Sequence, residues 1–281
     1  MTQAQTRDPE RNVIGNASVS LDLDTPELAA TYDRVSDRQF HHGKQLIASL
    51  NIRQGERVLD IGCGTGRLGS YVADLVGEKG EVIGIDPLPL RVELARKKHH
   101  PRFLAQVGNA EDLSDFADAS FDVVYLNSVF HWIGNKLKVL QEVHRVLKPG
   151  GRLGLNSGDA EKPHQSKLVV SQALADEQID PLRVATTGTS RPIARGELER
   201  LLNTAGFATS SGTQRTFEDF IDNVDDFISF SSSSSFGNFL HGLDQDESLR
   251  VRNRLSHRLE QLRTSAGIRL ERYLVFATAQ K

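Results

Sequence analysis

The stretch Val58-Leu-Asp-Ile-Gly-Cys-Gly-Thr-Gly66 joins the end of a hydrophobic strand to a glycine-rich turn. We expect Asp60 at the tip of the strand, with Gly62, Gly64 and Gly66 forming the turn into the next helix. Glycine lets the backbone approach a ligand closely because no side chain intervenes. A carboxylate at this turn would repel a pyrophosphate, but it suits a ligand with a cationic end.

The spacing of the glycines distinguishes this turn from the turn of dinucleotide-binding folds. Those folds use G-x-G-x-x-G, whereas here Arg67 stands where the third glycine would fall. Asp86 ends the second expected strand and is placed to accept hydrogen bonds from ribose hydroxyls, which both kinds of cofactor contain. The alternative interpretation, in which the glycines only let a strand pack tightly against a helix, is less favoured.

Hydrophobic strands and amphipathic helices alternate after Gly55. The expected strands are Arg57–Asp60, Glu81–Ile85, Arg102–Val107, Asp122–Leu126 and Arg152–Leu155. Buried apolar strands separated by helices imply a mostly parallel sheet covered on both faces. Right-handed crossovers place the ligand crevice at the carboxyl ends of such strands. The polar residues that fall just after strand ends are Asp60, Asp86, Asn109 and Asn127.

The flanking segments are less regular. Residues 1 to about 24 are expected to form a loose tail; a helix then starts with Pro26 at its first position, and a second helix carries Leu46 and Leu50. Further strands are expected at 207–216 and 272–278, and the run Ser231–Ser235 is expected to form a mobile loop. Phenylalanines that could form the core of a helical cap, a substrate-binding surface or both are Phe217, Phe220, Phe227, Phe230, Phe236 and Phe239.

Composition narrows the class of protein. The chain has 281 residues, a net charge of -3 and a pI near 6.3, which gives no reason to expect a nucleic-acid partner. Cys63 is the only cysteine, so no intrachain disulfide can form and a reducing compartment fits. We find neither an apolar signal core nor a membrane-spanning stretch, nor a cluster of metal ligands, and expect a cytoplasmic monomer or weak homodimer.

Five ordered motifs give the chain a specific resemblance to one family. They are Val58–Gly66, Gly84–Asp86, Gly108–Glu111, Phe121–Val124 and Arg145–Gly151. Together they resemble the class I S-adenosylmethionine (SAM)-dependent methyltransferases, and most closely the subgroup of ubiquinone/menaquinone-biosynthesis and small-molecule enzymes. The resemblance covers about residues 55–157. It implies an α/β, Rossmann-like sheet of seven strands, the last of them antiparallel and near 272–279, with helical cap insertions.

The resemblance also implies which residues bind SAM. Asp60 and the first glycines would hold its methionine part, Asp86 its ribose, and Asn109, where the family often has Asp, its adenine edge. Tyr32 resembles family residues that close over the cofactor. The complete expected set is Tyr32, Asp60, Gly62, Cys63, Gly64, Gly66, Asp86, Pro87, Leu88, Asn109, Ala110, Asn127 and Ser128.

The His131-Trp132 pair resembles carboxylate methyltransferases of the same superfamily, in which the pair lies near the methyl acceptor. His131 has three interpretations: a hydrogen-bonding positioner, a general base, or a packed histidine. Trp132 is interpreted as a wall of the pocket. The expected acceptor-binding residues are Tyr32, Phe130, His131 and Trp132.

The expected function is methyl transfer from SAM to a small, partly apolar metabolite by direct displacement. The acceptor is expected to be a thiol, carboxylate or hydroxyl, and methylation of dithiols in secondary metabolism remains open. Arsenite methyltransferases resemble the chain around Leu75–Gly80, but they hold arsenic with several cysteines, whereas this chain has only Cys63. The alternative from another class is a non-catalytic SAM-binding regulatory or scaffold subunit.

The expected organisation alternates core and cap segments. They are residues 1–45 for an N-terminal tail and cap helix, 46–157 for the SAM-binding core, 158–193 for a cap insertion, 194–216 for a core helix and strand, 217–265 for a helical lid insertion and 266–281 for the final core strand.

Overall fold

The protein is described from a computed structural model that covers residues 24–98, 100–184, 190–234, 239–240 and 242–281. The tail expected at the N-terminus and Phe236 lie outside these residues. Among the helices of the described segments, none combines the length and the apolar character needed to cross a membrane.

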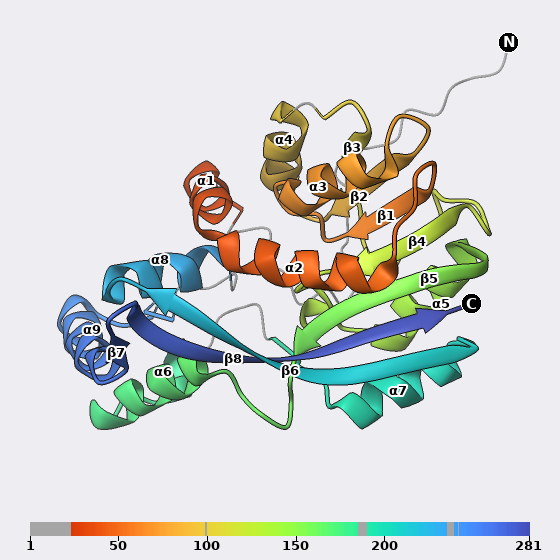
Figure 1. Ribbon diagram of the computed structural model, residues 1–281. Coiled ribbons are helices and arrows are strands. Elements are labelled where there is room, and N and C mark those ends of the chain that lie inside the picture. The colour runs from red at the N-terminus through yellow and green to blue at the C-terminus, as the bar shows by residue number, and fades with distance from the viewer. Residues whose placement is uncertain (1–23, 99, 185–189, 235–238, 241) are drawn as a thin grey trace, which may run out of the picture.

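Strands and helices alternate along the first half of the chain, as the sequence predicts (Figure 1). The strands are β1 (Arg57–Ile61), β2 (Glu81–Asp86), β3 (Phe103–Val107), β4 (Phe121–Leu126), β5 (Leu147–Gly158), β6 (Thr209–Ile221), β7 (Arg263–Thr264) and β8 (Gly267–Gln280). The α-helices are α1 (Pro26–Val35), α2 (Asp37–Leu50), α3 (Arg67–Val76), α4 (Pro89–Lys97), α5 (Lys136–Val146), α6 (Gln165–Asp176), α7 (Arg195–Thr204), α8 (Val224–Ser234) and α9 (Gln245–Glu260).

The sheet has the order β3-β2-β1-β4-β5-β8-β6, and the short β7 pairs with β8 outside this path. Neighbouring strands from β3 to β5 are parallel, whereas β8 runs antiparallel to both β5 and β6. The expected Rossmann-like sheet with an antiparallel last strand is therefore confirmed.

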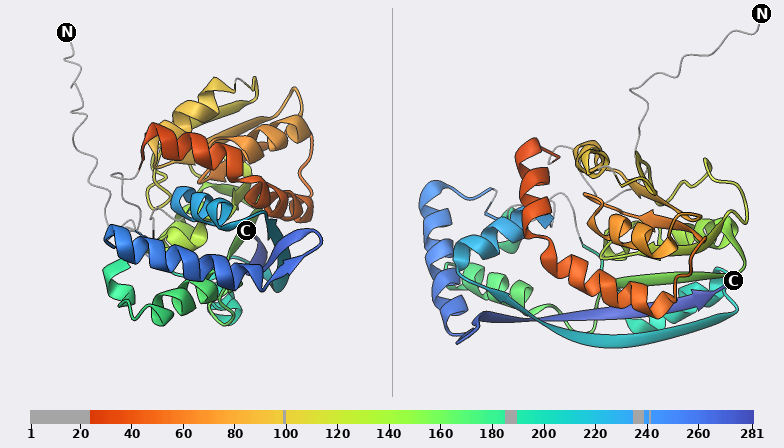
Figure 2. Two further views of the ribbon diagram at one scale, coloured as in Figure 1. Left: turned by 90° about the vertical axis from the view of Figure 1, so that its left-hand side faces the viewer. Right: turned by 45° about the horizontal axis from the view of Figure 1, so that its top comes forward.

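Alternate residues of the central strands point to opposite faces of the sheet. On one face Val58 packs with the buried side chains of α2 and α3, among them Leu46 and Val72. On the other face Leu59 packs with α5 and α7, through residues such as Leu140. Figure 2 shows the helices on both sides of the sheet. The central parallel strands β1, β2 and β4 are thus buried on both faces, which explains their continuous apolar sequences, whereas the edge strand β3 is partly exposed.

A second, smaller core lies beyond the ends of the parallel strands. Strands β6 and β8 are longer than expected and extend past the other strands, where α6, α8 and α9 pack against them (Figure 1). Its buried side chains include Val169, Phe227 and Leu255. We call α6, α8 and α9 the cap.

Two expected boundaries differ from the structure. Strand β6 continues to Ile221, so residues 217–221 belong to the sheet rather than to the lid, because they pair with β8 as far as Ile268. Helix α2 crosses the boundary expected at residue 45, because His42 and Leu46 lie on one buried face. The division of the chain into core and cap segments otherwise remains our proposal.

The expectation of a loop at the serine run is wrong for Ser231–Ser234, which form the last turn of α8. The Ser233 hydroxyl donates a hydrogen bond to the Ser229 carbonyl, one turn earlier. The Ser233 carbonyl accepts a hydrogen bond of 2.8 Å from the buried Arg91 guanidinium. These contacts hold the helix where a serine run alone would not.

The ring of Phe103 is enclosed by three glycines, which explains much of the glycine content near the turn. A Cβ atom added to Gly66, Gly69 or Gly84 would come within 2.6, 2.3 or 2.7 Å of that ring. The ring therefore cannot move away from one glycine without approaching another. Gly66 and Gly69 thus set the distance between α3 and the sheet.

This packing gives a prediction opposite to that of helix propensity. Replacing a helical glycine with alanine ordinarily stabilises a helix by about 1 kcal/mol. We expect Gly69→Ala instead to lower the free energy of unfolding by about 1–3 kcal/mol because the new methyl group overlaps Phe103. Urea denaturation measures the difference.

Gly196→Ala is the matched control, since this helical glycine of α7 has no atom within 4 Å of the added Cβ. It should raise stability by up to about 1 kcal/mol. Equal stabilisation by both substitutions would contradict the packing described for Phe103.

Candidate functional site

A cavity of about 670 Å³ lies at the carboxyl ends of the parallel strands, between the sheet and the cap. The expected site residues that line it are Tyr32, Gly62, Gly64, Asp86, Pro87, Asn127, Ser128, His131 and Trp132. The expected site residues that are not part of its lining are Asp60, Cys63, Gly66, Leu88, Asn109, Ala110 and Phe130.

The glycine turn forms one wall of the cavity. Gly62 has a φ of +76°, and a Cβ atom there would lie 2.1 Å from Val129 Cγ2. A Cβ atom on Gly64 would lie 3.3 Å from the ring of Tyr32, which reaches the turn from α1. Side chains at these two positions would therefore fill the space between the turn and its neighbours. The bare backbone is left facing the cavity.

Asp60 lies buried at the end of β1, just before the turn, and is 2% exposed. Its Oδ2 atom has no hydrogen-bond partner among the described residues. Burial raises the pKa of Asp60 to about 7; the Tyr125 hydroxyl lowers this pKa, although the two groups form no well-shaped hydrogen bond. A buried carboxyl with an unused acceptor atom favours a ligand that brings a donor or a positive charge.

The Asp86 carboxyl at the end of β2 is held in place by backbone donors. Its Oδ2 accepts a hydrogen bond of 2.9 Å from the Gly64 amide, and its Oδ1 accepts one of 3.0 Å from the Leu88 amide. Burial raises its pKa, and the nearby Arg91 guanidinium acts in the opposite direction. Each carboxyl oxygen keeps a second lone pair for a hydroxyl group in the cavity.

Asn127 and Ser128 follow β4 and are positioned by Asn156 of β5. The Asn156 amide donates to Asn127 Oδ1 at 2.7 Å, and its own Oδ1 accepts from the Ser128 amide at 2.6 Å. Asn127 in turn donates to the carbonyl of Gln39 in α2. This network fixes Ser128, whose φ of +59° is uncommon for a residue with a side chain. Asn156 was not predicted as a site residue because the fifth strand was expected to end at Leu155.

The remaining expected residues have local roles outside the cavity. Asn109 Oδ1 accepts a hydrogen bond from the Glu111 amide and so closes a turn. Leu88 is buried at the start of α4, and Phe130 is fully buried in the main core. The remaining residues of this group pack inside the core or beside it: Cys63, Gly66 and Ala110.

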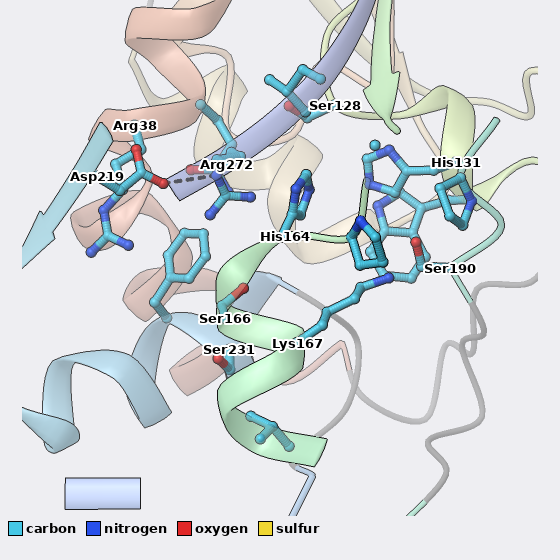
Figure 3. A pocket seen from close by; sticks show the side chains of 18 of the residues that line it. Arg38, Ser128, His131, His164, Ser166, Lys167, Ser190, Asp219, Ser231 and Arg272 are labelled. Atoms are coloured by element: carbon cyan, nitrogen blue, oxygen red, sulfur yellow. Dashed lines mark hydrogen bonds and ion pairs between the residues drawn. The ribbon is translucent and has the colours of Figure 1, made fainter. Parts of the chain in front are cut away.

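His131 and Trp132 stand side by side on the cavity wall, with ring centroids 5.0 Å apart. Burial and the nearby Lys167 and Arg272 lower the pKa of His131 to about 3, so the imidazole is neutral at pH 7. Its Nδ1 atom is buried and has no partner among the described residues. Figure 3 shows His131 at one end of the pocket, with Lys167 extending toward it.

Several polar residues of the cavity were not predicted from the sequence. They are Arg38, Arg91, Asp159, His164, Lys167, Asp219, Glu271 and Arg272. They come from α2, α4, the loop between β5 and α6, α6 itself and the extended parts of β6 and β8, and no motif links them along the chain. The only available signal was the position of Asp159, directly after the end of β5.

These features fit a nucleoside with a cationic tail. The side-chain-free positions Gly62 and Gly64, the unpaired buried carboxyl of Asp60 beside them and the Asp86 carboxyl at the end of β2 suit a SAM-like molecule. Among the described residues, no cluster of three or more His, Cys, Asp or Glu side chains could hold a metal ion.

Comparison with protein families and curated sequences agrees with this geometry. A family described as a methyltransferase domain matches residues 52–206, which is more than half of the chain. The chain is 34% identical over 134 residues to the demethylmenaquinone methyltransferase of Geobacillus kaustophilus, covering 44% of this chain and 57% of that protein. It is 35% identical over 155 residues to the ubiquinone/menaquinone biosynthesis C-methyltransferase of Pseudoalteromonas translucida, covering 51% and 61%. The matched part thus spans less than two thirds of these relatives.

Solved structures share the fold over a larger part of the chain. The YcgJ protein of Bacillus subtilis superimposes with a TM-score of 0.60 and 20% identity, covering 86% of this chain and 98% of that one. A phosphoethanolamine N-methyltransferase of Haemonchus contortus, solved with S-adenosylhomocysteine, gives a TM-score of 0.52 and 18% identity, covering 86% and 52%. From the family match, the chain belongs to the methyltransferase domain family, and its fold is that of a class I SAM-dependent methyltransferase domain.

Proposed function

We propose that the protein transfers the methyl group of SAM to a small, partly apolar metabolite by direct displacement. The observation that carries this proposal is the continuity of the cavity, which is lined at one end by Gly62 and Asp86 and at the other by cap residues. The apolar side chains that line this end are Val170 and Leu174 of α6, Phe227 of α8, and Val184 and Phe239 from the segments between the cap helices. A thiol, carboxylate or hydroxyl group on the metabolite would be the methyl acceptor.

We propose that the core end holds SAM, which supplies an electrophilic methyl group when bound. Asp60 and the backbone of Gly62 and Gly64 would hold its methionine part, and Asp86 would accept hydrogen bonds from the ribose hydroxyls. Tyr32 packs against the turn and would cover the bound molecule. Holding donor and acceptor in line can contribute roughly 7–11 kcal/mol to lowering the barrier.

Two features narrow the acceptor chemistry. The Cys63 thiol is buried, and burial raises its pKa well above the usual value, so it is not available as a thiolate ligand for arsenic. His131, with a pKa of about 3, is too weak a base to deprotonate a hydroxyl group efficiently at neutral pH. We therefore propose that His131 positions the acceptor by hydrogen bonding, and that the acceptor arrives ionised or easily ionised.

Incubation of the protein with methyl-labelled SAM and a panel of thiols, carboxylic acids and phenols tests the proposed activity. Transfer of label to at least one class is expected. Tight SAM binding without transfer to any class would instead support the alternative of a regulatory or scaffold subunit.

The raised pKa of Asp60 predicts that the affinity for SAM changes with pH near neutrality. Since its pKa is about 7, SAM binding should require loss of the carboxyl proton and should weaken as pH falls from 7.5 to 5.5, approaching a factor of about ten per pH unit well below the pKa. Asp60→Asn should bind SAM weakly at every pH in this range. Isothermal titration calorimetry measures the Kd of SAM for the wild type and for Asp60→Asn across this pH range.

The same substitution should stabilise the free protein. The pKa of Asp60 is raised from 3.8 in the unfolded chain to about 7, so the native state loses stability as pH rises between these values, by up to about 4 kcal/mol. Asp60→Asn removes this pH-dependent destabilisation. In urea denaturation the free energy of unfolding of the variant should exceed that of the wild type at pH 8, and the two should be equal at pH 4.

An Asp60→Asn protein that binds SAM as the wild type does would refute the cofactor role.

His131→Ala should reduce turnover about tenfold, the effect of one lost positioning hydrogen bond of ordinary strength, while the Kd of SAM changes less than twofold. The pH profile of kcat should show no step between pH 5 and 8 that depends on His131, because this group is neutral throughout. His100→Ala is the control, since His100 pairs with Asp74 away from the cavity. A large loss of SAM affinity in His131→Ala would contradict the assignment.

A further inference from the structure

Basic side chains gather in the part of the cavity that faces the cap. Arg38 reaches it from α2, Lys167 from the first turn of α6, and Arg272 from β8. Figure 3 shows Arg38 and Arg272 near Asp219 at one end, and Lys167 extending toward the other. This region is separate from Asp60 and the glycine turn.

The carboxylates of the cavity already have partners. Asp219 pairs with Arg272 at 2.7 Å and lies 3.6 Å from His42. Asp159 accepts hydrogen bonds from the Gln214 side chain and the Glu161 amide.

Glu271 pairs with Arg269 and accepts a hydrogen bond from the Tyr273 hydroxyl. Asp86 accepts hydrogen bonds from two backbone amides, as described above. Every carboxylate among the described lining residues therefore has a partner, and the unpaired Asp60 carboxyl lies outside the lining, beside the glycine turn.

Two of the basic groups lack such a partner. Neither the Lys167 ammonium nor the Arg38 guanidinium forms an ion pair among the described residues, although the Asp219 carboxylate is near enough to Arg38 to act against the lowering of its pKa by burial. Arg38 instead lies over the ring of Phe230, 4.6 Å from its centroid. Lys167 has a large accessible area because it extends into the cavity, yet surrounding protein atoms lower its pKa by desolvation. A partly desolvated ammonium such as that of Lys167, with no carboxylate acting on it, is unfavourable unless a ligand supplies the anion.

The start of α6 adds to this positive potential. Its first turn contains no acidic residue, and no side chain among the described residues caps its N-terminus. The N-terminal end of a helix of this length carries partial positive charge. Lys167 and Ser166 bring this helix end to the cavity wall.

His164, directly before α6, adds an oriented hydrogen-bond donor. Its Nδ1 atom accepts a hydrogen bond of 3.1 Å from the Tyr273 amide, so the neutral ring carries its proton on Nε2. Burial together with the charges of Arg272 and Lys167 lowers its pKa to about 2 and keeps the ring neutral. The Nε2–H group faces Gly158, whose missing side chain leaves the approach open.

We propose that the methyl acceptor is an anionic metabolite, and that its carboxylate or phosphate group binds at the start of α6, paired with Lys167 and hydrogen-bonded by His164. Arg38, which forms no ion pair, provides further attraction across the cavity, and the apolar part of the metabolite lies against the cap. This inference rests on the proposed function and names its class of substrate. The group that binds Lys167 is a recognition group and need not be the atom that receives the methyl group.

The experiment uses the full chain saturated with S-adenosylhomocysteine and three ring-bearing probes: benzoate, phenyl phosphate and benzamide. Dissociation constants are measured by ligand-observed NMR. At least one anionic probe should bind about tenfold more tightly than the neutral benzamide, as expected for one charged hydrogen-bonded pair. Preference for benzoate would indicate a carboxylate, and preference for phenyl phosphate a phosphate.

Lys167→Met should abolish the preference for the anion, whereas Lys167→Arg should retain it. Lys162→Met is the matched control, because Lys162 lies near the cavity but not in its lining and contacts the ring of Tyr273. All three variants should bind S-adenosylhomocysteine as the wild type does, which also shows that they are folded.

Equal binding of benzamide and both anions, no binding of any probe, or a preference that survives in Lys167→Met would overturn the inference while leaving the proposed function intact. Failure of the wild-type protein to bind S-adenosylhomocysteine would instead overturn the proposed function. The proposed function and the proposed class of substrate are therefore tested by different measurements.

Discussion

The proposed SAM-binding end of the cavity depends on the buried, unpaired carboxyl of Asp60. Its burial at the end of β1 is unfavourable in the free protein because nothing among the described residues satisfies its Oδ2 atom. A destabilising buried group of this kind is retained where it binds a ligand. Removing the carboxyl would stabilise the fold but would leave the glycine turn without a negative charge. The glycines complete the arrangement by letting the backbone face the same space.

The cavity combines two chemically different ends. Core strands supply carboxyl groups and bare backbone, which suit the positively charged tail and the ribose of SAM. The cap supplies apolar surface and the Lys167 ammonium, and α2 adds Arg38; together they suit a partly apolar anion. The extensions of β6 and β8 connect the two ends, because they run from the sheet into the cap and carry Asp219 and Arg272 between them.

The sequence predicts the core well because its signals are local. Strand ends, glycine spacing and polar residues after strands are each visible within a few residues, and the structure has the antiparallel last strand that the resemblance implied. Individual side chains were harder to place. Phe130 is next to His131 in sequence, but it points into the core, and Asn109 uses its side chain to close a turn.

The cap could not be predicted in the same way. Lys167, Arg38 and Arg272 come from three distant segments and meet only in the folded chain. The serine run looked like a loop by composition, yet contacts with Arg91 and its own backbone hold it as a helix. Tertiary contacts of this kind override local propensity and leave no periodic pattern.

The most direct test of the account is the pKa of Asp60 itself, measured by NMR titration of the protein carrying ¹³C-labelled aspartate, with and without S-adenosylhomocysteine. Asp60→Asn identifies the resonance. The account predicts a value near 7 in the free protein and a value lower by at least about one unit in the complex, where the ligand's cationic group stabilises the carboxylate. An ordinary value near 4 in the free protein, or the same raised value in both states, would contradict it.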